Sequence, residues 1–128
     1  MATALDVTDA LEPGASPNAL AAAALYRIPE NTEWKVENLA AVGAEPVVCE
    51  AVDVLTRRTG ETYMDYVRRV CAAPGQAGQA ARLVMVADLR LGIARTDSDA
   101  LRERYAASLP LLQGALGPSE DLSVATVT

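Results

Sequence analysis

The stretch Ala81–Arg95, which reads ARLVMVADLRLGIAR, decides how the rest of the chain is interpreted. Between positions 83 and 93, every residue is apolar except Asp88, Arg90 and Gly92. A helix that is apolar on nearly every side is normally buried in the core of a protein. The sequence therefore predicts a central, buried helix around which the other segments pack.

Asp88 is the one acidic residue in the middle of this apolar stretch. A buried carboxylate is costly unless it is paired, hydrogen-bonded or bound to a metal. The residues three and four positions away share its helix face, and none of them can neutralise it: Val84, Met85, Leu91 and Gly92. We therefore expect its partner to come from another segment, and the functional question becomes what Asp88 faces.

The length of 128 residues predicts a single domain. A net charge of −6 argues against a nucleic-acid partner and against an anionic membrane surface, because both require a basic face. No apolar run approaches the roughly 20 residues of a membrane span. Acidic residues precede the apolar run Ala19–Leu25, where a signal peptide would be basic. A cytoplasmic protein is expected.

The chain has no histidine and only two cysteines, which limits its chemistry. Without histidine, nucleophile–histidine catalysis and ordinary histidine–metal sites are excluded. Cys49 and Cys71 each fall within an apolar helical pattern, so we interpret them as small buried side chains in a reducing compartment. No metal site and no cofactor are predicted.

Capping and breaker signals divide the rest of the chain into further helices. We expect helices over Pro17 to about Arg27, Glu33–Ala41 (capped by Asn31 or Thr32), Pro46 to about Arg58, Glu61–Ala73, Ala81–Arg95, and from Asp97 or Ser98 to about Leu116, the last kinked by Pro110. The glycine-containing segment Pro74–Gly78 is predicted to be a loop. In the fourth helix, an ion pair between Asp65 and Arg69 should support the exposed face.

These patterns predict an all-α fold, a compact bundle of five to six helices. Residues 1–15 are expected to be flexible or loosely helical, with a helical turn near Thr8–Leu11. Residues 16–117 should form a single helical domain, and residues 118–128 a flexible tail. No alternating pattern is long enough to indicate a strand.

Two phrases of the sequence suggest a family. Leu55–Tyr63, reading LTRRTGETY, followed by Val86–Arg90, reading VADLR, resembles the HD-domain metal-dependent phosphohydrolases. The small bacterial members related to the (p)ppGpp hydrolase domain are the most similar. The resemblance covers residues 17–117 and implies an HD-like helical fold with a shortened N-terminal part. It also implies a divalent metal held by two histidines, an aspartate paired with one of them, and a later aspartate.

The chain departs from this family at its metal ligands. Matched position by position, Tyr26 replaces a histidine, Arg27 replaces the paired aspartate, and Asp88 stands at the late aspartate. Glu30 matches an acidic residue beside the site, and Leu91-Gly92 replaces a usual Asp-Asn pair. With three of the four ligands missing, we expect no bound metal and no hydrolase activity of the family type.

Arg27 offers Asp88 a partner in place of the metal. A planar guanidinium binds a carboxylate through two parallel hydrogen bonds. We therefore hypothesise that Arg27 pairs with Asp88, and that Tyr26 donates a hydrogen bond within the former metal site. The alternative is that Arg27 reaches solvent at a helix end.

The pairing predicts that Arg27→Ala lowers the free energy of unfolding by about 3–5 kcal/mol, because it leaves a buried carboxylate without its partner. Urea denaturation of the purified variant measures this loss. A variant with unchanged stability would exclude the pairing.

The sequence leads to a function based on binding. The main hypothesis is a catalytically inactive HD-like protein that binds a phosphorylated small molecule or a protein partner, including a second copy of itself across a less covered side of the central helix. The candidate ligand-binding residues are Tyr26, Arg27, Arg57, Arg58, Tyr63 and Asp88. For Arg57, Arg58 and Tyr63, the alternative is structural, a basic pair that ends a helix and a core tyrosine.

A second hypothesis is a phosphohydrolase-like enzyme with an altered site, acting on a nucleotide or phosphate ester. Glu30 or Asp88 would then serve as a general base, with a pKa raised by burial. No second catalytic group is evident in the sequence.

Overall fold

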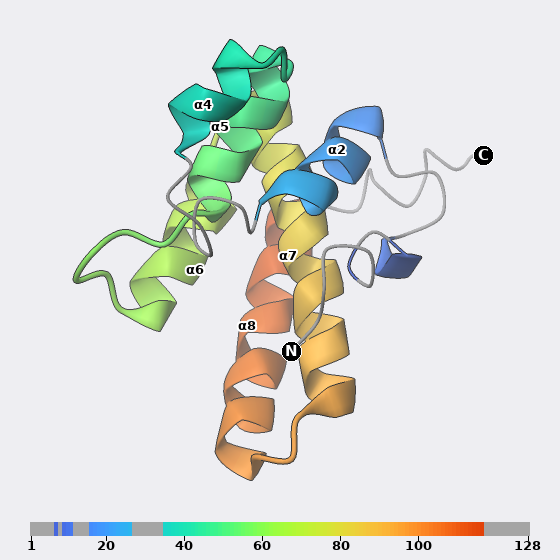
Figure 1. Ribbon diagram of the computed structural model, residues 1–128. Helices are drawn as coiled ribbons and strands as arrows, with labels where there is room; N and C mark the ends of the chain where they lie inside the picture. The colour runs from blue at the N-terminus through green and yellow to red at the C-terminus, as the bar shows by residue number, and fades with distance from the viewer. Residues whose placement is uncertain (1–6, 8, 12–15, 27–34, 117–128) are drawn as a thin grey trace.

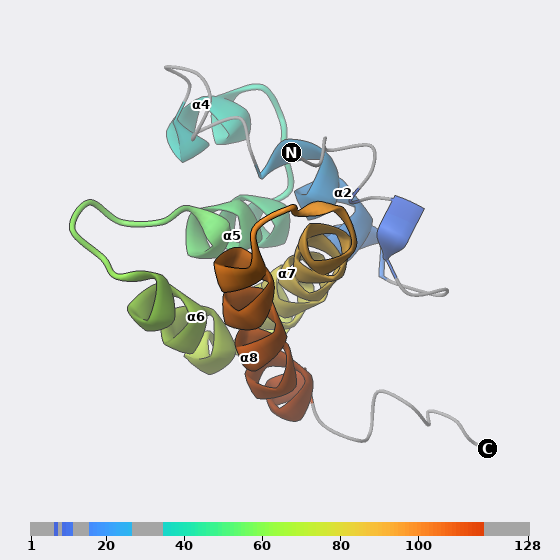
Figure 2. The same cartoon turned by 90° about the horizontal axis from the view of Figure 1, so that it is seen from below.

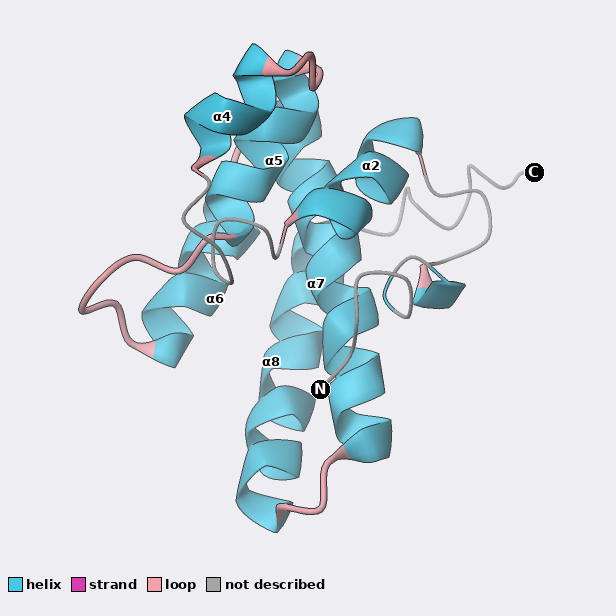
Figure 3. Cartoon of the chain, in the orientation of Figure 1, coloured by secondary structure: helices cyan, strands magenta, loops and turns pink. Residues whose placement is uncertain are grey.

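The computed structural model describes residues 7, 9–11, 16–26 and 35–116. Within these residues the chain is helical and forms no strand, which confirms the predicted all-α fold (Figure 3). The helices are α2 (Pro17–Leu25), α4 (Val36–Ala41), α5 (Pro46–Leu55), α6 (Tyr63–Ala72), α7 (Gly75–Arg95) and α8 (Asp99–Leu116).

The long helix α7 occupies the centre of the bundle, as the apolar stretch around Asp88 predicts. It contacts α2, α5, α6 and α8, and Figures 1 and 2 show these helices arranged around it. Its buried residues extend from the first turn to the middle of the helix: Ala77, Gly78, Ala80, Ala81, Arg82, Val84, Met85, Val86, Ala87 and Leu89. The core is therefore built on the N-terminal two thirds of α7.

Alanine side chains bring α2 close to α7. The three buried residues of α2 are alanines with no exposed surface: Ala19, Ala22 and Ala23. The side chain of Ser16 caps this helix, accepting a hydrogen bond from the backbone N–H of Ala19 at 3.2 Å, and Pro17 follows at the first helical position. Small residues on both sides let the helix backbones approach, which the alanine-rich composition favours.

The segment before α2 also contributes to the core. Val7 has no exposed surface, and Ala10 and Leu11 pack against the buried cluster. Asp9 and Ala10 are helical, in agreement with the helical turn expected near Thr8–Leu11.

Several predicted helix ends differ from those observed. Helix α5 ends at Leu55 and not near Arg58, and α6 begins at Tyr63 after the capping residue Thr62. The residues between them form a connection whose polar groups bind the end of α5, as described below. Helix α4 is capped by Lys35, not by Asn31 or Thr32, and the side chain of Asn38 accepts from its backbone N–H at 2.8 Å.

The predicted loop Pro74–Gly78 is wrong, because α7 begins at Gly75. Gly75 has a φ of +71°, a conformation that glycine adopts at little cost. A Cβ at Gly78 would lie 1.9 Å from the backbone oxygen of Ala73. The two glycines therefore allow a sharp turn and a close approach between the end of α6 and the first turn of α7.

This close approach predicts a large loss of stability for Gly78→Ala. The added methyl group would meet backbone, which cannot move aside as a flexible side chain could, so we expect a cost of about 2–4 kcal/mol. Gly114→Ala is the matched control, because no atom lies within 4 Å of its Cβ position in α8. The free energy of unfolding of that variant should rise by about 0.5–1 kcal/mol, because alanine has a higher helix propensity than glycine. Thermal and urea denaturation measure both, and equal effects in the two variants would contradict the packing argument.

Candidate functional site

A cavity of about 420 Å³ lies where the end of α2, the end of α5 and the start of α6 meet the C-terminal half of α7 and the N-terminal half of α8. All four tyrosines of the chain line it: Tyr26, Tyr63, Tyr66 and Tyr105. The other lining residues are Leu55, Met85, Asp88, Leu89, Leu91, Gly92, Arg95, Thr96 and Leu101. A mainly apolar cavity with a few polar groups has the composition of a small-molecule site.

One face of α7 carries the two charged residues among the described residues that line the cavity, Asp88 and Arg95. Asp88, Gly92 and Arg95 follow one another at helical spacing, so they share this face. Asp88 is half-buried. The carboxylate is therefore less buried than the apolar stretch predicts, because α7 borders the cavity at this position.

Three of the tyrosine rings form one wall of contacting aromatic groups. The ring centroid of Tyr63 lies 6.4 Å from that of Tyr66, at an interplanar angle of 67°. It lies 6.4 Å from that of Tyr105, at an angle of 53°. Such tilted and edge-on arrangements are favourable for aromatic pairs.

Tyr63 remains a protonated phenol in this position. Burial raises the pKa of its hydroxyl above the usual value near 10, and the negative charge of Asp88 acts in the same direction, against the opposing influence of Ser108 and Arg104. Tyr63 therefore offers a ring face and a hydrogen-bond donor at neutral pH, and not a base.

Gly92 allows Tyr105 to lie directly against α7. A Cβ at Gly92 would lie 2.8 Å from Cε2 and 2.9 Å from Cδ2 of the Tyr105 ring. Since real side chains do not approach so closely, any larger residue at this position would displace the ring. The glycine thus sets the shape of the cavity between α7 and α8.

Of the three arginines predicted to bind a ligand, Arg57 and Arg58 are described, and they lie in different surroundings. Arg58 donates from Nη1 to the carbonyl oxygens of Asp53 (2.7 Å) and Thr56 (2.8 Å), and it pairs with the Asp53 carboxylate at 3.1 Å. Neither Arg58 nor Arg57 is among the residues that line the cavity. Arg57 is closer to the site, because its Cζ lies 5.9 Å from the centroid of the Tyr63 ring.

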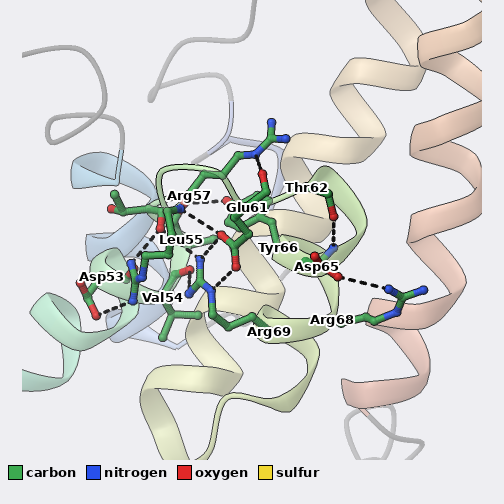
Figure 4. Close-up of polar contacts among 12 residues, drawn as sticks. Asp53, Val54, Leu55, Arg57, Glu61, Thr62, Asp65, Tyr66, Arg68 and Arg69 are labelled. Carbon is green, nitrogen blue, oxygen red and sulfur yellow. Dashed lines mark hydrogen bonds and ion pairs between the residues drawn. The ribbon is translucent and has the colours of Figure 1, made fainter.

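An ion pair that the sequence did not reveal holds the connection between α5 and α6 (Figure 4). Arg69 donates from Nε to Oε2 of Glu61 at 2.8 Å and from Nη2 to Oε1 at 3.0 Å. It also donates to the carbonyl oxygen of Val54 at 2.8 Å. The predicted pair between Asp65 and Arg69 was wrong, because Asp65 pairs instead with the exposed Arg68 at 3.4 Å.

This network also positions two of the cavity tyrosines. The hydroxyl of Tyr66 donates to the carbonyl oxygen of Leu55 at 2.6 Å, and the guanidinium of Arg69 lies 5.5 Å from the Tyr66 ring centroid. Tyr63 is the first residue of α6, directly after the connection that Glu61 closes. In the sequence, the only sign of this network is that Glu61 and Arg69, which can hydrogen-bond to each other, lie on either side of the start of a helix.

The ion pair lowers the pKa of Glu61 from 4.5 to about 2, chiefly through its hydrogen bonds with Arg69. A carboxyl whose folded-state pKa is lowered stabilises the fold above its unfolded pKa, and this contribution is lost as the pH falls. For Glu61 the loss should occur between about pH 4.5 and pH 2.

Glu61→Gln should accordingly destabilise the protein at pH 7 by about 1.5–3 kcal/mol, the usual contribution of hydrogen bonds to a charged group. Its stability should also depend less on pH between 4.5 and 2 than that of the wild type. Asp65→Asn is the control, because its carboxylate is 61% exposed and should contribute little. Urea denaturation over this pH range measures both effects, and a pH dependence identical to that of the wild type would contradict this role for Glu61.

The predicted partners of Asp88 are only partly described. Tyr26 lines the same cavity as Asp88. Arg27 and Glu30 lie outside the described residues, so the pairing of Arg27 with Asp88 stays a prediction. In the part of the chain that the structure describes, no three acidic or cysteine side chains come together to hold a metal ion.

Comparison with known proteins identifies no relative. No protein-family model, no curated protein and no solved structure matches this chain. The resemblance to HD-domain proteins therefore remains an expectation that rests on the residue phrases alone. No helix within the described ranges is long and apolar enough to cross a membrane.

Proposed function

We propose that this protein is a binding protein that holds a small molecule in the tyrosine-lined cavity beside Asp88. The observation that carries the proposal is the convergence of all four tyrosines on one cavity. They are four of only five aromatic residues in the chain, yet they come from α6, from α8 and from the end of α2.

The chemistry of the lining suits binding. A volume of about 420 Å³ falls within the range typical of small-molecule pockets. Tyrosine supplies a large, rigid contact surface with few rotatable bonds, so little conformational entropy is lost when a ligand is held. The carboxylate of Asp88 and the hydroxyls of the tyrosines provide the few polar contacts that orient a ligand.

The same groups are poorly arranged for catalysis. General acid–base reactions need a group whose pKa lies near the working pH. Tyr63 is held further from that range, since its pKa is raised. Asp88 is the one carboxylate among the lining residues that the structure describes. No observation favours the alternative of a phosphohydrolase with an altered site.

The proposal includes descent from an HD-type hydrolase. Tyr26 and Asp88 stand at two former ligand positions in the resemblance, and their place in one cavity supports that interpretation. A protein partner or homodimer has less support. The exposed large hydrophobic residues of the described chain are spread over α2, the end of α4 and α8: Leu20, Val42 and Leu111.

The proposal predicts that a ligand perturbs several tyrosines together. Protein labelled with 3-fluorotyrosine is screened by ¹⁹F NMR against a library of small metabolites. A compound in the cavity should shift the signals of at least two tyrosines, because all four line the same space. If no compound moves more than one tyrosine signal, the cavity is not a binding site.

A matched pair of variants then tests the location. Leu101→Trp places a large ring at a half-buried lining position and should weaken binding more than tenfold by filling the cavity. Leu111→Trp makes the same change on the exposed side of α8 and should leave binding unchanged. Equal affinities in both variants would place the ligand elsewhere.

A further inference from the structure

Two arginines from different elements lie against the ring of Tyr63. Arg57 belongs to the connection between α5 and α6, and its Cζ lies 5.9 Å from the ring centroid. Arg104 belongs to α8, and its Cζ lies 5.2 Å from the same centroid. Both residues are exposed, whereas Tyr63 lines the cavity. Neither arginine is among the residues that line the cavity, so both guanidinium groups lie just outside it, against the ring of Tyr63, a position called the rim below.

These two arginines retain most of their hydrogen-bonding capacity. Arg57 uses Nε to donate to the carbonyl oxygen of Glu61 at 3.1 Å, and no contact within the described ranges engages its two Nη groups. The guanidinium of Arg104 has no hydrogen bond or ion pair within those ranges, although its backbone carbonyl accepts a hydrogen bond from the Ser108 hydroxyl at 2.9 Å. A guanidinium has five N–H donors, so the pair presents many donors to the rim.

The acidic side chains of the α5–α6 region do not neutralise this pair. Glu61 is bound by Arg69, Asp65 pairs with Arg68, and Asp53 pairs with Arg58 (Figure 4). Two positively charged groups therefore lie against the Tyr63 ring, in a chain whose net charge is −6. On the α7 side, both Asp88 and Arg95 line the cavity.

We propose that Arg57 and Arg104 bind the anionic group of a small aromatic acid whose ring lies in the cavity. This inference rests on the proposed function, and it names the class of ligand. Guanidinium groups bind carboxylate and phosphate oxygens through parallel hydrogen bonds, and the tyrosine rings offer faces for an aromatic body.

Three probes test the charge preference: phenylacetate, phenyl phosphate and the neutral phenylacetamide. Each is titrated into the full-length, 3-fluorotyrosine-labelled protein at low salt and at 0.5 M NaCl. At low salt the anions should bind about tenfold more tightly than the amide, because one or two charge-assisted hydrogen bonds contribute a binding free energy of about this size. High salt should reduce this preference, because both arginines are exposed. The tighter of the two anions identifies carboxylate or phosphate as the preferred group.

Substitutions at the rim test the residues. Arg57→Gln and Arg104→Gln should each weaken the binding of the anions about three- to tenfold, and the double variant should bind anion and amide equally. Amide binding should not change, which shows that the cavity is intact. Arg68→Gln is the matched control, since it removes the same charge from an exposed arginine that pairs with Asp65.

The outcomes separate the two proposals. If the amide and the anions bind the wild type equally, or if both rim variants bind the anions as the wild type does, the anion site is wrong and the cavity remains a binding site. If neither these probes nor any member of the metabolite library shifts the tyrosine signals, both proposals fail.

Discussion

The paired hydrogen bonds between Arg69 and Glu61 are the interaction on which the geometry of the cavity depends. A helix leaves its last carbonyl groups without partners inside the helix. In α5 the five carbonyls from Val52 to Thr56 each accept a hydrogen bond from a side chain. The donors are Thr56, Arg58, Tyr66 and Arg69. Arg69 donates to two of these carbonyls while Glu61 binds the same guanidinium. These bonds hold the start of α6, with its two tyrosines, against the end of α5.

The same use of arginine recurs at the ends of two further helices. Arg82 of α7 is buried and donates from Nη1 to the carbonyls of Val70, Cys71 and Ala73 at the end of α6. Arg102 of α8 donates to the carbonyls of Ile93 and Thr96 at the end of α7. A planar guanidinium reaches several carbonyls at once and carries the positive charge that a helix C-terminus favours, which lysine does less well. Four of the ten arginines, Arg58, Arg69, Arg82 and Arg102, bind carbonyl groups at helix ends in this way.

The sequence predicts those parts of the fold that depend on local patterns. The apolar spacing of Val48, Ala51, Val52 and Leu55, and of Val67 and Val70, identifies faces that the structure buries. The sequence is misleading where one type of residue can serve two different structural roles. Glycines at 75 and 78 are typical of a loop, but here they serve a sharp turn and a close backbone contact, which only the tertiary structure reveals. Likewise, helical spacing favours Asp65 as the partner of Arg69, whereas Glu61 reaches it through the connection before α6.

The candidate site also combines residues that the sequence singles out with residues that only the tertiary packing brings to them. The sizes of the side chains explain why a cavity forms at this place. Asp88 and Tyr63 stand out in the sequence, whereas Tyr66, Tyr105 and Arg104 join them only through the packing of α6 and α8. On the N-terminal part of α7, alanines allow the neighbouring helices to approach closely. On its C-terminal part, the neighbours carry tyrosines, and rigid planar rings cannot fill an irregular space as flexible aliphatic chains do. Space therefore remains between rings that the α5–α6 network already holds in place, and a ligand would contact several of them without ordering them first.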